Sequence, residues 1–428
     1  MDQKDIDPDK SAPENKKIEE PKPKKSSKDK DDSGDIGELL NNIVYTAYVQ
    51  KASDIHIEAT EHDVLVRYRI DGILYDKLLI DKSFEDELIF KIKISAKIRT
   101  DEHFAPQDGR IAFKFPGVED KLDTRISILP TSKGAKVVIR LLTKEGKTLS
   151  LDQLGIKGKS LELVKKSYEK PWGMILAVGP TGCGKTTTLY VILQIINSRE
   201  KNITTIEDPV EFEIDGVNHI QVNPNGNLTF ANGLRSILRQ DPDTVMVGEI
   251  RDTETARIAI NAAMTGHLVL STLHTNDAVT TVPRLIDMGI EPYLVASTVN
   301  LIIAQRLARL LCVKCKESYE MTAEELKDLS EIRPDIAKEI KLHQKIFRHK
   351  GCKECGNTGY KGRVGLYEIL EVTKTMREMI SSQNFNVDDL YDESKKWGLV
   401  RIFDDGIEKM NQGLLDVPEL IRVIALTE

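Results

Sequence analysis

The first regular pattern of apolar residues starts after position 37. Its apolar positions recur at the spacing of a helix and are Leu39, Leu40, Ile43, Val44 and Ala47. Short stretches in which apolar and polar residues alternate follow at 55–57 and 64–70, and Asp71-Gly72 has the composition of a hairpin turn. A further mixed stretch runs to residue 142. The pattern predicts one small α+β domain over residues 37–143.

The pattern changes in the middle of the chain. Short runs of continuous apolar residues are separated there by longer helical or loop segments, and they are 174–178, 202–206, 244–247 and 268–271. Runs of this kind are expected of strands buried on both faces of a parallel sheet. We therefore predict an α/β domain with a mainly parallel sheet over 160–311. Residues 144–159, rich in Lys, Gly and Asp, are the predicted linker before it.

The two ends of the chain differ from these domains. Residues 1–36 hold 11 acidic residues and 9 lysines with almost no apolar periodicity, which predicts a disordered, charged tail. Such a tail is either solvated without a specific role or a tether to a membrane-bound partner, and both alternatives stay open. At the other end, residues 312–370 carry two CxxC pairs around a helical insertion. Residues 371–428 are predicted to form helices.

Composition narrows the class of protein. The chain has 428 residues, of which 40% are hydrophobic and 30% charged, so roughly two to four soluble globular domains are expected. The formal net charge of −7 argues against a generally basic surface for nucleic acid. No apolar run approaches the ~18 residues that span a bilayer, and the charged N-terminus lacks the apolar segment of a secretory signal. The expected location is the cytoplasm.

One segment has a specific chemical signature. Residues 179–186 fit G-x-x-x-x-G-K-[ST] at every fixed position, between a predicted strand and a helical pattern. In such a loop the glycines let successive N–H groups point at phosphate oxygens. Lys185 is expected to reach the β- and γ-phosphates of ATP, and Thr186 to place its hydroxyl on Mg²⁺. The predicted nucleotide-binding residues are Gly179, Pro180, Thr181, Gly182, Cys183, Gly184, Lys185, Thr186 and Thr187.

Polar residues at the ends of predicted strands complete the candidate site. Glu207 and Glu249 each follow one of the apolar runs, and the carboxyl ends of parallel strands lie at one edge of a sheet. Glu249 stands where a magnesium-binding acid is expected, with Glu207 beside it, and the sequence leaves open which of them activates the attacking water. His267 and His274 flank the run at 268–271. A histidine at that position can hydrogen-bond the γ-phosphoryl group.

Four of the five cysteines form two CxxC pairs, Cys312-Cys315 and Cys352-Cys355. Four thiolates in this arrangement suit tetrahedral Zn²⁺ without an open position, so we predict a structural zinc site. Redox-active or unpaired cysteines are the alternative. Zinc elements also bind nucleic acid, but residues 311–370 carry 12 basic and 10 acidic residues, and a phosphate backbone needs a denser positive surface. We expect no nucleic-acid partner.

Taken together, these segments resemble the secretion ATPases that drive type II secretion and type IV pilus assembly. The resemblance covers nearly the whole chain after the tail. Besides the phosphate loop, the segments of the α/β domain that carry it are 204–211, 245–249 and 265–278. Those of the small domain are 53–58, 67–72, 106–110 and 129–131. The combination is far more specific than any one motif.

The resemblance implies a RecA-like ATPase domain, preceded by a PAS-like small domain and followed by the zinc-binding and helical region. It implies a homohexamer with ATP between the two domains, in which Arg110, Arg125 and Arg140 of the small domain reach the phosphates. Family members act on a platform protein of the inner membrane, which implies peripheral association with the cytoplasmic membrane. Longer members have a folded extra N-terminal domain, which we do not expect here. In this family, assembly and secretion motors typically carry the tetracysteine element, whereas retraction motors typically lack it. The resemblance therefore favours an assembly or secretion motor over a retraction motor.

Other functions stay open on the sequence alone. A retraction-type, DNA-translocating or conjugative motor would use the same phosphate loop, and DNA would stimulate the ATPase of the DNA-translocating type. A scaffold that binds nucleotide without hydrolysing it would release no phosphate. The joint presence of Lys185, Thr186, Glu207 and Glu249 favours hydrolysis.

Overall fold

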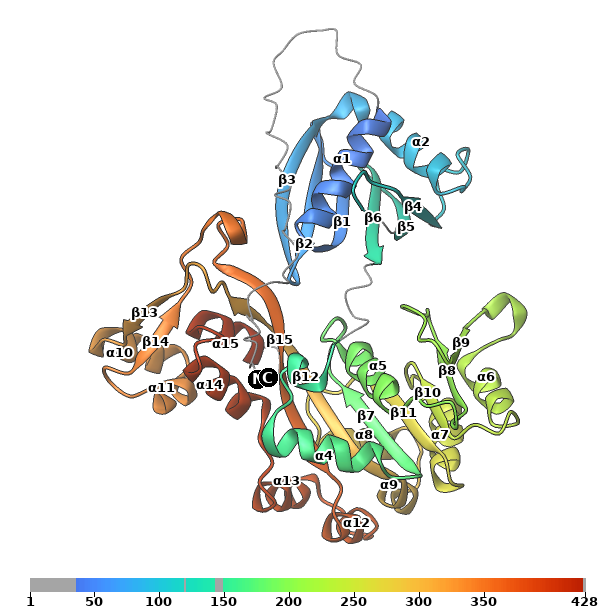
Figure 1. The fold of residues 1–428 in the computed structure, drawn as a ribbon, viewed down its shortest axis with the longest axis vertical. Coiled ribbons are helices and arrows are strands. Elements are labelled where there is room, and N and C mark those ends of the chain that lie inside the picture. Colours follow the sequence, from blue (N-terminus) through green and yellow to red (C-terminus); the bar gives the residue numbers. More distant parts are fainter. Residues whose placement is uncertain (1–35, 119–120, 143–148, 426–428) are drawn as a thin grey trace, which may run out of the picture.

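The computed structural model describes residues 36–118, 121–142 and 149–425, and the predicted disordered tail lies outside these ranges except for Ile36, which begins a helix. Figure 1 shows two lobes: the small domain in blue to teal, and a larger α/β lobe to which the orange and red C-terminal region is joined. Within the described ranges, no helix combines the length and the apolar character that a membrane crossing requires.

The small domain, in the part of the chain described, is a six-stranded antiparallel sheet with the strand order β3-β2-β1-β6-β5-β4. Helices α1 (Ile36–Val49) and α2 (Glu85–Ser95) share its apolar core. The strands and a short 3₁₀ turn are β1 (Ala52–Ala59), β2 (Asp63–Ile70), β3 (Ile73–Asp81), η1 (Lys82–Phe84), β4 (Gln107–Phe113), β5 (Leu122–Thr131) and β6 (Gly134–Leu142). Asp71 and Gly72 have φ angles of 49° and 88°, so the predicted hairpin turn is confirmed.

The larger lobe is built on a seven-stranded sheet among the described residues, with the order β15-β12-β7-β11-β10-β8-β9. Neighbouring strands are parallel except β15, which is antiparallel to β12. The predicted α/β fold with a mainly parallel sheet is confirmed, and the structure adds three strands that the apolar runs did not predict, β9, β12 and β15. The strands are β7 (Gly173–Val178), β8 (Ile203–Glu207), β9 (Val217–Gln221), β10 (Thr244–Val247), β11 (Leu268–Leu273), β12 (Val299–Leu311) and β15 (Tyr360–Glu371).

Helices cover both faces of this sheet. Alternate residues of the buried strand β7 therefore enter the two cores on its opposite faces. Met174, Leu176 and Val178 share a core with α6, α7 and α9, whereas Ile175 and Ala177 share one with α3, α4 and α5. The helices of this lobe are α3 (Leu151–Leu154), α4 (Gly158–Tyr168), α5 (Lys185–Ile196), η3 (Pro224–Gly226), α6 (Phe230–Ile237), α7 (Thr253–Met264), α8 (Thr281–Asp287) and α9 (Pro292–Thr298).

The predicted linker, 144–159, is only partly described, and its described part is folded. Helix α3 begins behind a capping box at Ser150, and Leu151 and Ile156 are buried in the α/β core. Four apolar residues, Leu149, Leu151, Leu154 and Ile156, stand among Lys, Gly and Asp, and this stretch is too short to predict a helix. The folded α/β lobe therefore starts before residue 160.

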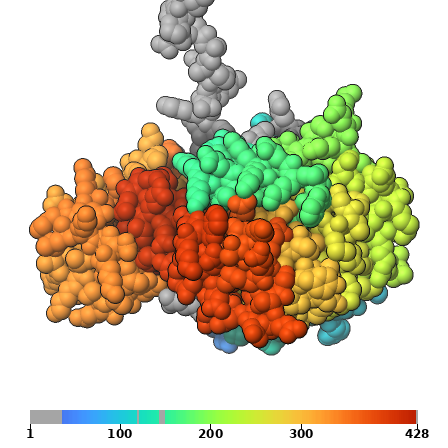
Figure 2. Space-filling model, turned by 90° about the horizontal axis from the view of Figure 1, so that it is seen from below, coloured from blue at the N-terminus to red at the C-terminus, as the bar shows by residue number. Residues whose placement is uncertain are grey.

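The C-terminal region packs beside the main sheet. Figure 2 shows the green segment that includes α4 next to the orange and red C-terminal segments on one face, and Lys166 of α4 contacts Glu371 at 2.8 Å. The helical insertion predicted between the CxxC pairs includes α10, which begins behind a capping box at Thr322. Because β15 runs through residue 370 into the main sheet, the predicted boundary at 370/371 crosses a strand. The elements are β13 (Glu317–Glu320), α10 (Ala323–Ile332), α11 (Pro334–Glu339), β14 (Lys345–Arg348), η4 (Lys353–Cys355), α12 (Lys374–Ile380), α13 (Val387–Lys396), α14 (Ile402–Asn411) and α15 (Val417–Ile424).

Candidate functional site

The phosphate loop connects β7 to α5, in the context that its motif requires. Gly179, Gly182 and Gly184 have φ angles of 145°, 78° and 90°, a region that favours glycine. A Cβ atom on Gly179 would lie 2.6 Å from the carbonyl oxygen of Gln305 and 2.7 Å from Sγ of Cys183. Cys183 is buried, and burial raises the pKa of its thiol, as expected for a residue that only fits the loop. A glycine bend ahead of a helix N-terminus is the backbone arrangement that binds phosphate.

Lys185 is the first residue of α5, and its side chain turns back over the loop. Nζ donates to the carbonyl oxygens of Gly179 at 2.8 Å and Pro180 at 3.0 Å. The side chain is buried, and burial is the largest cause of its lowered pKa. A buried ammonium group surrounded by carbonyl oxygens is a favourable partner for anionic phosphates. Thr186 and Thr187 follow in the same turn and are partly exposed.

Two buried residues of β12, which the sequence analysis did not single out, support the loops around the site. Gln305 donates from Nε2 to the carbonyl oxygen of Cys183 at 2.6 Å. Arg306 donates from Nη2 to the carbonyl oxygen of Asn276 at 2.8 Å, in the loop that follows β11. The signal that could have found them is two adjacent polar residues inside a mostly apolar segment, because buried polar groups need partners.

Glu249 lies beyond the end of β10 and belongs to the same cluster as Lys185. Its carboxylate contacts Nη2 of Arg251 at 2.5 Å and lies 3.6 Å from Nε2 of His274. Burial, and then the nearby charge of Lys185, lower the pKa of His274. The structure thus brings Lys185, Glu249 and His274 together at one edge of the sheet.

Glu207, the other predicted acid, is the last residue of β8 and is only 2% exposed. Its two carboxylate oxygens are hydrogen-bonded to Tyr190 at 2.5 Å, Thr205 at 2.5 Å and His219 at 2.9 Å. A Cβ atom on Gly248 would lie 3.3 Å from Cα of Glu207, so the backbone that leads to the second acid passes close to the first. The two acids are neighbours, but protein groups already occupy both oxygens of Glu207.

His267 is not part of the cluster, contrary to our prediction for it. It precedes β11 while His274 follows that strand, and β11 is parallel to β7. Seven steps of ~3.3 Å each along the extended chain place the Cα atoms of the two histidines about 23 Å apart. Nδ1 of His267 donates instead to the carbonyl oxygen of Ala262 at 3.0 Å. Two residues that flank one strand necessarily lie at opposite edges of the sheet.

The three predicted arginines form a row across the sheet of the small domain. Arg110 of β4 lies opposite Arg125 of β5, which lies opposite Arg140 of β6, so the side chains share one face. Nη2 of Arg125 donates to the carbonyl oxygen of Val210, in the loop after β8, at 3.0 Å. Burial, with a further contribution from the charges of Arg110 and Arg140, lowers the pKa of Arg125. The row meets the larger lobe at Arg125, whereas Nε of Arg140 is paired with the carboxylate of Asp54 at 3.0 Å. A cation at the contact between the lobes suits an anionic ligand there.

The two lobes also meet at the tip of the β2–β3 hairpin. The N–H of Gly362 donates to the carboxylate of Asp71 at 2.9 Å, and Nε of Arg363 lies 3.6 Å from the same carboxylate. This contact joins the small domain to the first residues of β15, close in sequence to the second cysteine pair.

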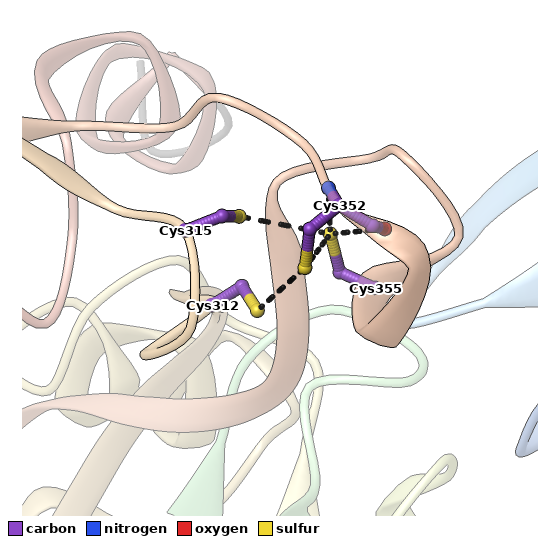
Figure 3. Close-up of side chains that lie close together, drawn as sticks. All are labelled: Cys312, Cys315, Cys352 and Cys355. Carbon is purple, nitrogen blue, oxygen red and sulfur yellow. Dashed lines mark hydrogen bonds between the residues drawn. The ribbon is translucent and has the colours of Figure 1, made fainter.

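The four cysteines of the CxxC pairs converge on one point (Figure 3), with all sulfur atoms within 4.8 Å of one another. Cys312 and Cys352 are 3.9 Å apart, and Cys315 and Cys355 are 3.8 Å apart. Tetrahedral Zn–S bonds of ~2.3 Å would place the sulfurs ~3.8 Å apart, so the set fits Zn²⁺. Burial opposes ionisation of Cys355, but the N–H groups of Cys352 and Gly359 donate to its sulfur and its pKa is lowered to about 7. That shift favours the thiolate that a metal requires.

Comparison with known proteins agrees with this geometry. Residues 29–422 match the family described as type II/IV secretion system protein. The chain belongs to this family. Its relatives include the type II secretion system ATPase E of Vibrio cholerae, which is 44% identical over 395 residues that cover 92% of this chain and 76% of that protein. The type IV pilus assembly ATPase PilB of Myxococcus xanthus is 42% identical over 390 residues, 91% of this chain and 68% of that protein.

The solved structures of a pilus retraction motor and of an ATPase resemble this chain in fold. The pilus retraction motor PilT with bound ADP aligns with a TM-score of 0.59 at 25% identity, over 90% of this chain and 96% of that chain. The ATPase DotB of Legionella pneumophila aligns with a TM-score of 0.66 at 20% identity, over 91% of this chain and 95% of that chain. The family thus agrees with the resemblance given by the motifs.

Proposed function

We propose that this member of the type II/IV secretion system family is an ATP-hydrolysing motor that powers type IV pilus assembly or type II secretion. The observation that carries the proposal is the cluster of Lys185, Glu249 and His274, which converge from the carboxyl ends of the neighbouring parallel strands β7, β10 and β11. A phosphate-binding cation, an acid and a neutral imidazole at one edge of a sheet are the groups that phosphoryl transfer to water requires.

Each residue has a distinct role in this proposal. Lys185 binds the β- and γ-phosphates, and the Thr186 hydroxyl and the Glu249 carboxylate supply oxygen donors of the kind that Mg²⁺ prefers. When bound, the ion neutralises charge that develops on the phosphates. Glu249, partly exposed, also orients the attacking water, whereas Glu207 acts from its buried position behind the site. His274, whose lowered pKa keeps it neutral, hydrogen-bonds the γ-phosphoryl group.

The row of Arg110, Arg125 and Arg140 closes over the phosphates in the proposed mechanism. A guanidinium binds phosphate in a fork that an ammonium cannot form. Loss of the γ-phosphoryl group removes the anion that holds the two lobes together, so their relative angle changes. In a ring of six chains, which we propose as the working assembly, these changes become mechanical work. Sedimentation with Mg²⁺ and ATP is expected to give a species of six chains.

The partner in this proposal is a platform protein of the inner membrane, on whose cytoplasmic side the ring acts. The four cysteines hold a structural Zn²⁺, and the tetracysteine element favours assembly or secretion over retraction. A pull-down from membranes with the full chain, and with a chain that lacks residues 1–36, tests where this partner binds. Recovery of the membrane-embedded protein with the full chain alone would identify the tail as the contact. Equal recovery with both would place the contact on the ring.

Replacement of Lys185 by Ala tests the assignment of the site. Phosphate release from Mg²⁺-ATP is expected to fall by about 100-fold or more, because the positive charge at the γ-phosphate is lost. The control is Lys201→Ala, which removes an exposed lysine that follows the same helix. Unaltered turnover in Lys185→Ala would refute the site.

The wild-type chain separates the alternatives. Retention of labelled ATP without any phosphate release would favour a non-hydrolysing scaffold. ATPase activity that rises when DNA is added would favour a DNA-translocating or conjugative motor over the proposed one.

A further inference from the structure

The buried network around Glu207 is more elaborate than a strand-end acid needs. Tyr190 Oη binds one carboxylate oxygen, while Thr205 Oγ1 and His219 Nδ1 bind the other. All four side chains are nearly inaccessible to water, with Glu207 at 2% and Tyr190 at 1% exposure. Hydrogen bonds to an ionised group in such surroundings are strong and directional. The carboxylate is therefore held in one orientation.

The surrounding backbone fixes the tautomer of His219. The N–H of Ile214 donates to Nε2 of His219 at 3.1 Å, so Nε2 is an acceptor and carries no proton. The ring proton is then on Nδ1, which donates to Glu207. His219 is thus a neutral bridge from the backbone at Ile214 to the acid at the end of β8.

Tyr190 connects the same acid to the nucleotide-binding helix. It lies on α5, which Lys185 begins, and its hydroxyl oxygen also accepts the N–H of Glu211 at 3.4 Å. Its ring meets that of Phe212 edge-on with the centroids 4.6 Å apart, a favoured arrangement of aromatic rings. The loop 208–212 is therefore attached to the helix that follows the phosphate loop.

The loop 208–212 is also where the small domain touches the larger lobe. Arg125 donates to the carbonyl oxygen of Val210, and its buried Nε has no hydrogen-bond partner among the described residues. A buried N–H of a guanidinium without a hydrogen-bond partner raises the free energy of the folded state. The position of the Arg125 side chain is therefore sensitive to how the loop 208–212 is held. One continuous set of contacts runs from the small domain through this loop to α5.

We propose that Tyr190 and His219 are positioning residues of the ATPase reaction, which fix Glu207 and the loop 208–212 to α5 and so set where Arg125 meets the larger lobe. The inference rests on the proposed function. Neither side chain touches the phosphate-binding groups, so their removal should impair turnover more than nucleotide binding.

The first test is a double-mutant cycle in the full chain. Tyr190→Phe removes only the hydroxyl, and kcat is expected to fall by about 10- to 100-fold with KM changed by less than about 3-fold. In a Glu207→Gln background the same change should have little further effect, because the two residues act as one unit. The control is Tyr68→Phe, which deletes an equally buried hydroxyl that donates to the carbonyl oxygen of Ile43 in the small domain.

The second test uses a conservative variant of His219. Gln offers both an N–H for Glu207 and an oxygen for the N–H of Ile214, whereas Leu offers neither. We expect His219→Gln to retain most of kcat and His219→Leu to lose as much as Tyr190→Phe. Equal loss in both variants, an unchanged kcat in Tyr190→Phe, or additive effects with Glu207→Gln would overturn the proposal. Absence of phosphate release from the wild-type chain would instead overturn the proposed function.

Discussion

Glu368 of β15 is a buried acid under the loop that carries His274. It is 4% exposed and accepts the N–H of Ala278 at 2.8 Å. Burial raises the pKa of Glu368 to about 7 from an ordinary value of 4.5. Glu368→Gln keeps an oxygen for the N–H of Ala278 and removes the charge, so it isolates the cost of ionising this carboxyl group.

The sign and size of the effect follow from the two pKa values. Between pH 4.5 and about 7 the folded chain binds a proton at Glu368 that the unfolded chain has released, so the free energy of unfolding falls as the pH rises. A shift of about 2.5 units corresponds to about 3 kcal/mol, lost almost completely by about pH 7. Relative to wild type, Glu368→Gln is therefore expected to be more stable by about 3 kcal/mol at about pH 8, and by about 1 kcal/mol or less at about pH 5.

Denaturant unfolding of both proteins across this pH range measures the difference. Glu331→Gln, which replaces an exposed acid of α10, is the matched control and should show no pH-dependent difference. A difference between Glu368→Gln and wild type that is the same at both pH values would refute the reasoning. It would mean that a nearby cation such as Arg306, whose pKa is affected by Glu368, keeps the carboxylate ionised in the folded chain.

Three further predictions concern the metal site, the histidine and the contact between the lobes. The purified chain should contain one Zn²⁺. Removal of the ion by a chelator should lower the midpoint of thermal unfolding, because the metal binds only the folded site. A zinc-free chain with the same midpoint would contradict this prediction. Since the pKa of His274 is lowered from 6.5, the profile of kcat against pH should fall on its acid side at a pH below 6.5. This fall should disappear in His274→Gln, and a fall that persists in the variant would exclude His274 as its source. Asp71→Ala removes a partly exposed contact worth about 1 kcal/mol, so X-ray scattering should show a shift from the docked to a more extended arrangement, about five-fold in the equilibrium. An unchanged scattering curve would mean that the other contacts, those of Arg125 with Val210 and of Arg309 with Tyr75, hold the lobes together.

Much of the fold could be predicted from local patterns. Strands buried on both faces give continuous apolar runs, and the runs at 174–178 and 268–271 correspond to β7 and β11. Strand β15 could not be predicted in this way. It follows the cysteine pairs and pairs with β12, although 49 positions separate Leu311 at the end of β12 from Tyr360 at the start of β15. Long-range antiparallel pairing leaves no periodic signal in either segment. Helix α3 was missed because its short buried face is surrounded by loop-forming residues.

The candidate site divides in a similar way. Spacing alone placed Lys185 at the start of α5 and grouped the four cysteines, since both are set by short-range geometry. The network of Tyr190 and His219 depends on contacts between α5, β8 and β9, so the identity of either residue says little without the fold. His267 fails for the opposite reason: proximity in sequence to a strand does not determine which end of the sheet a residue occupies.

Glu207 and Glu249 have different environments because β8 continues one residue past the end of its apolar run. The apolar run predicts a strand that ends at 206, which would leave Glu207 in a loop, but β8 includes it. Within a strand, residues two apart point to the same face, so Glu207 lies beside Thr205 and turns towards Tyr190 of α5. Glu249 lies two residues beyond β10, free of that alternation, and reaches His274 instead. The same residue type at the ends of two parallel strands is therefore a buried, fully hydrogen-bonded group in one case and a partly exposed neighbour of His274 in the other.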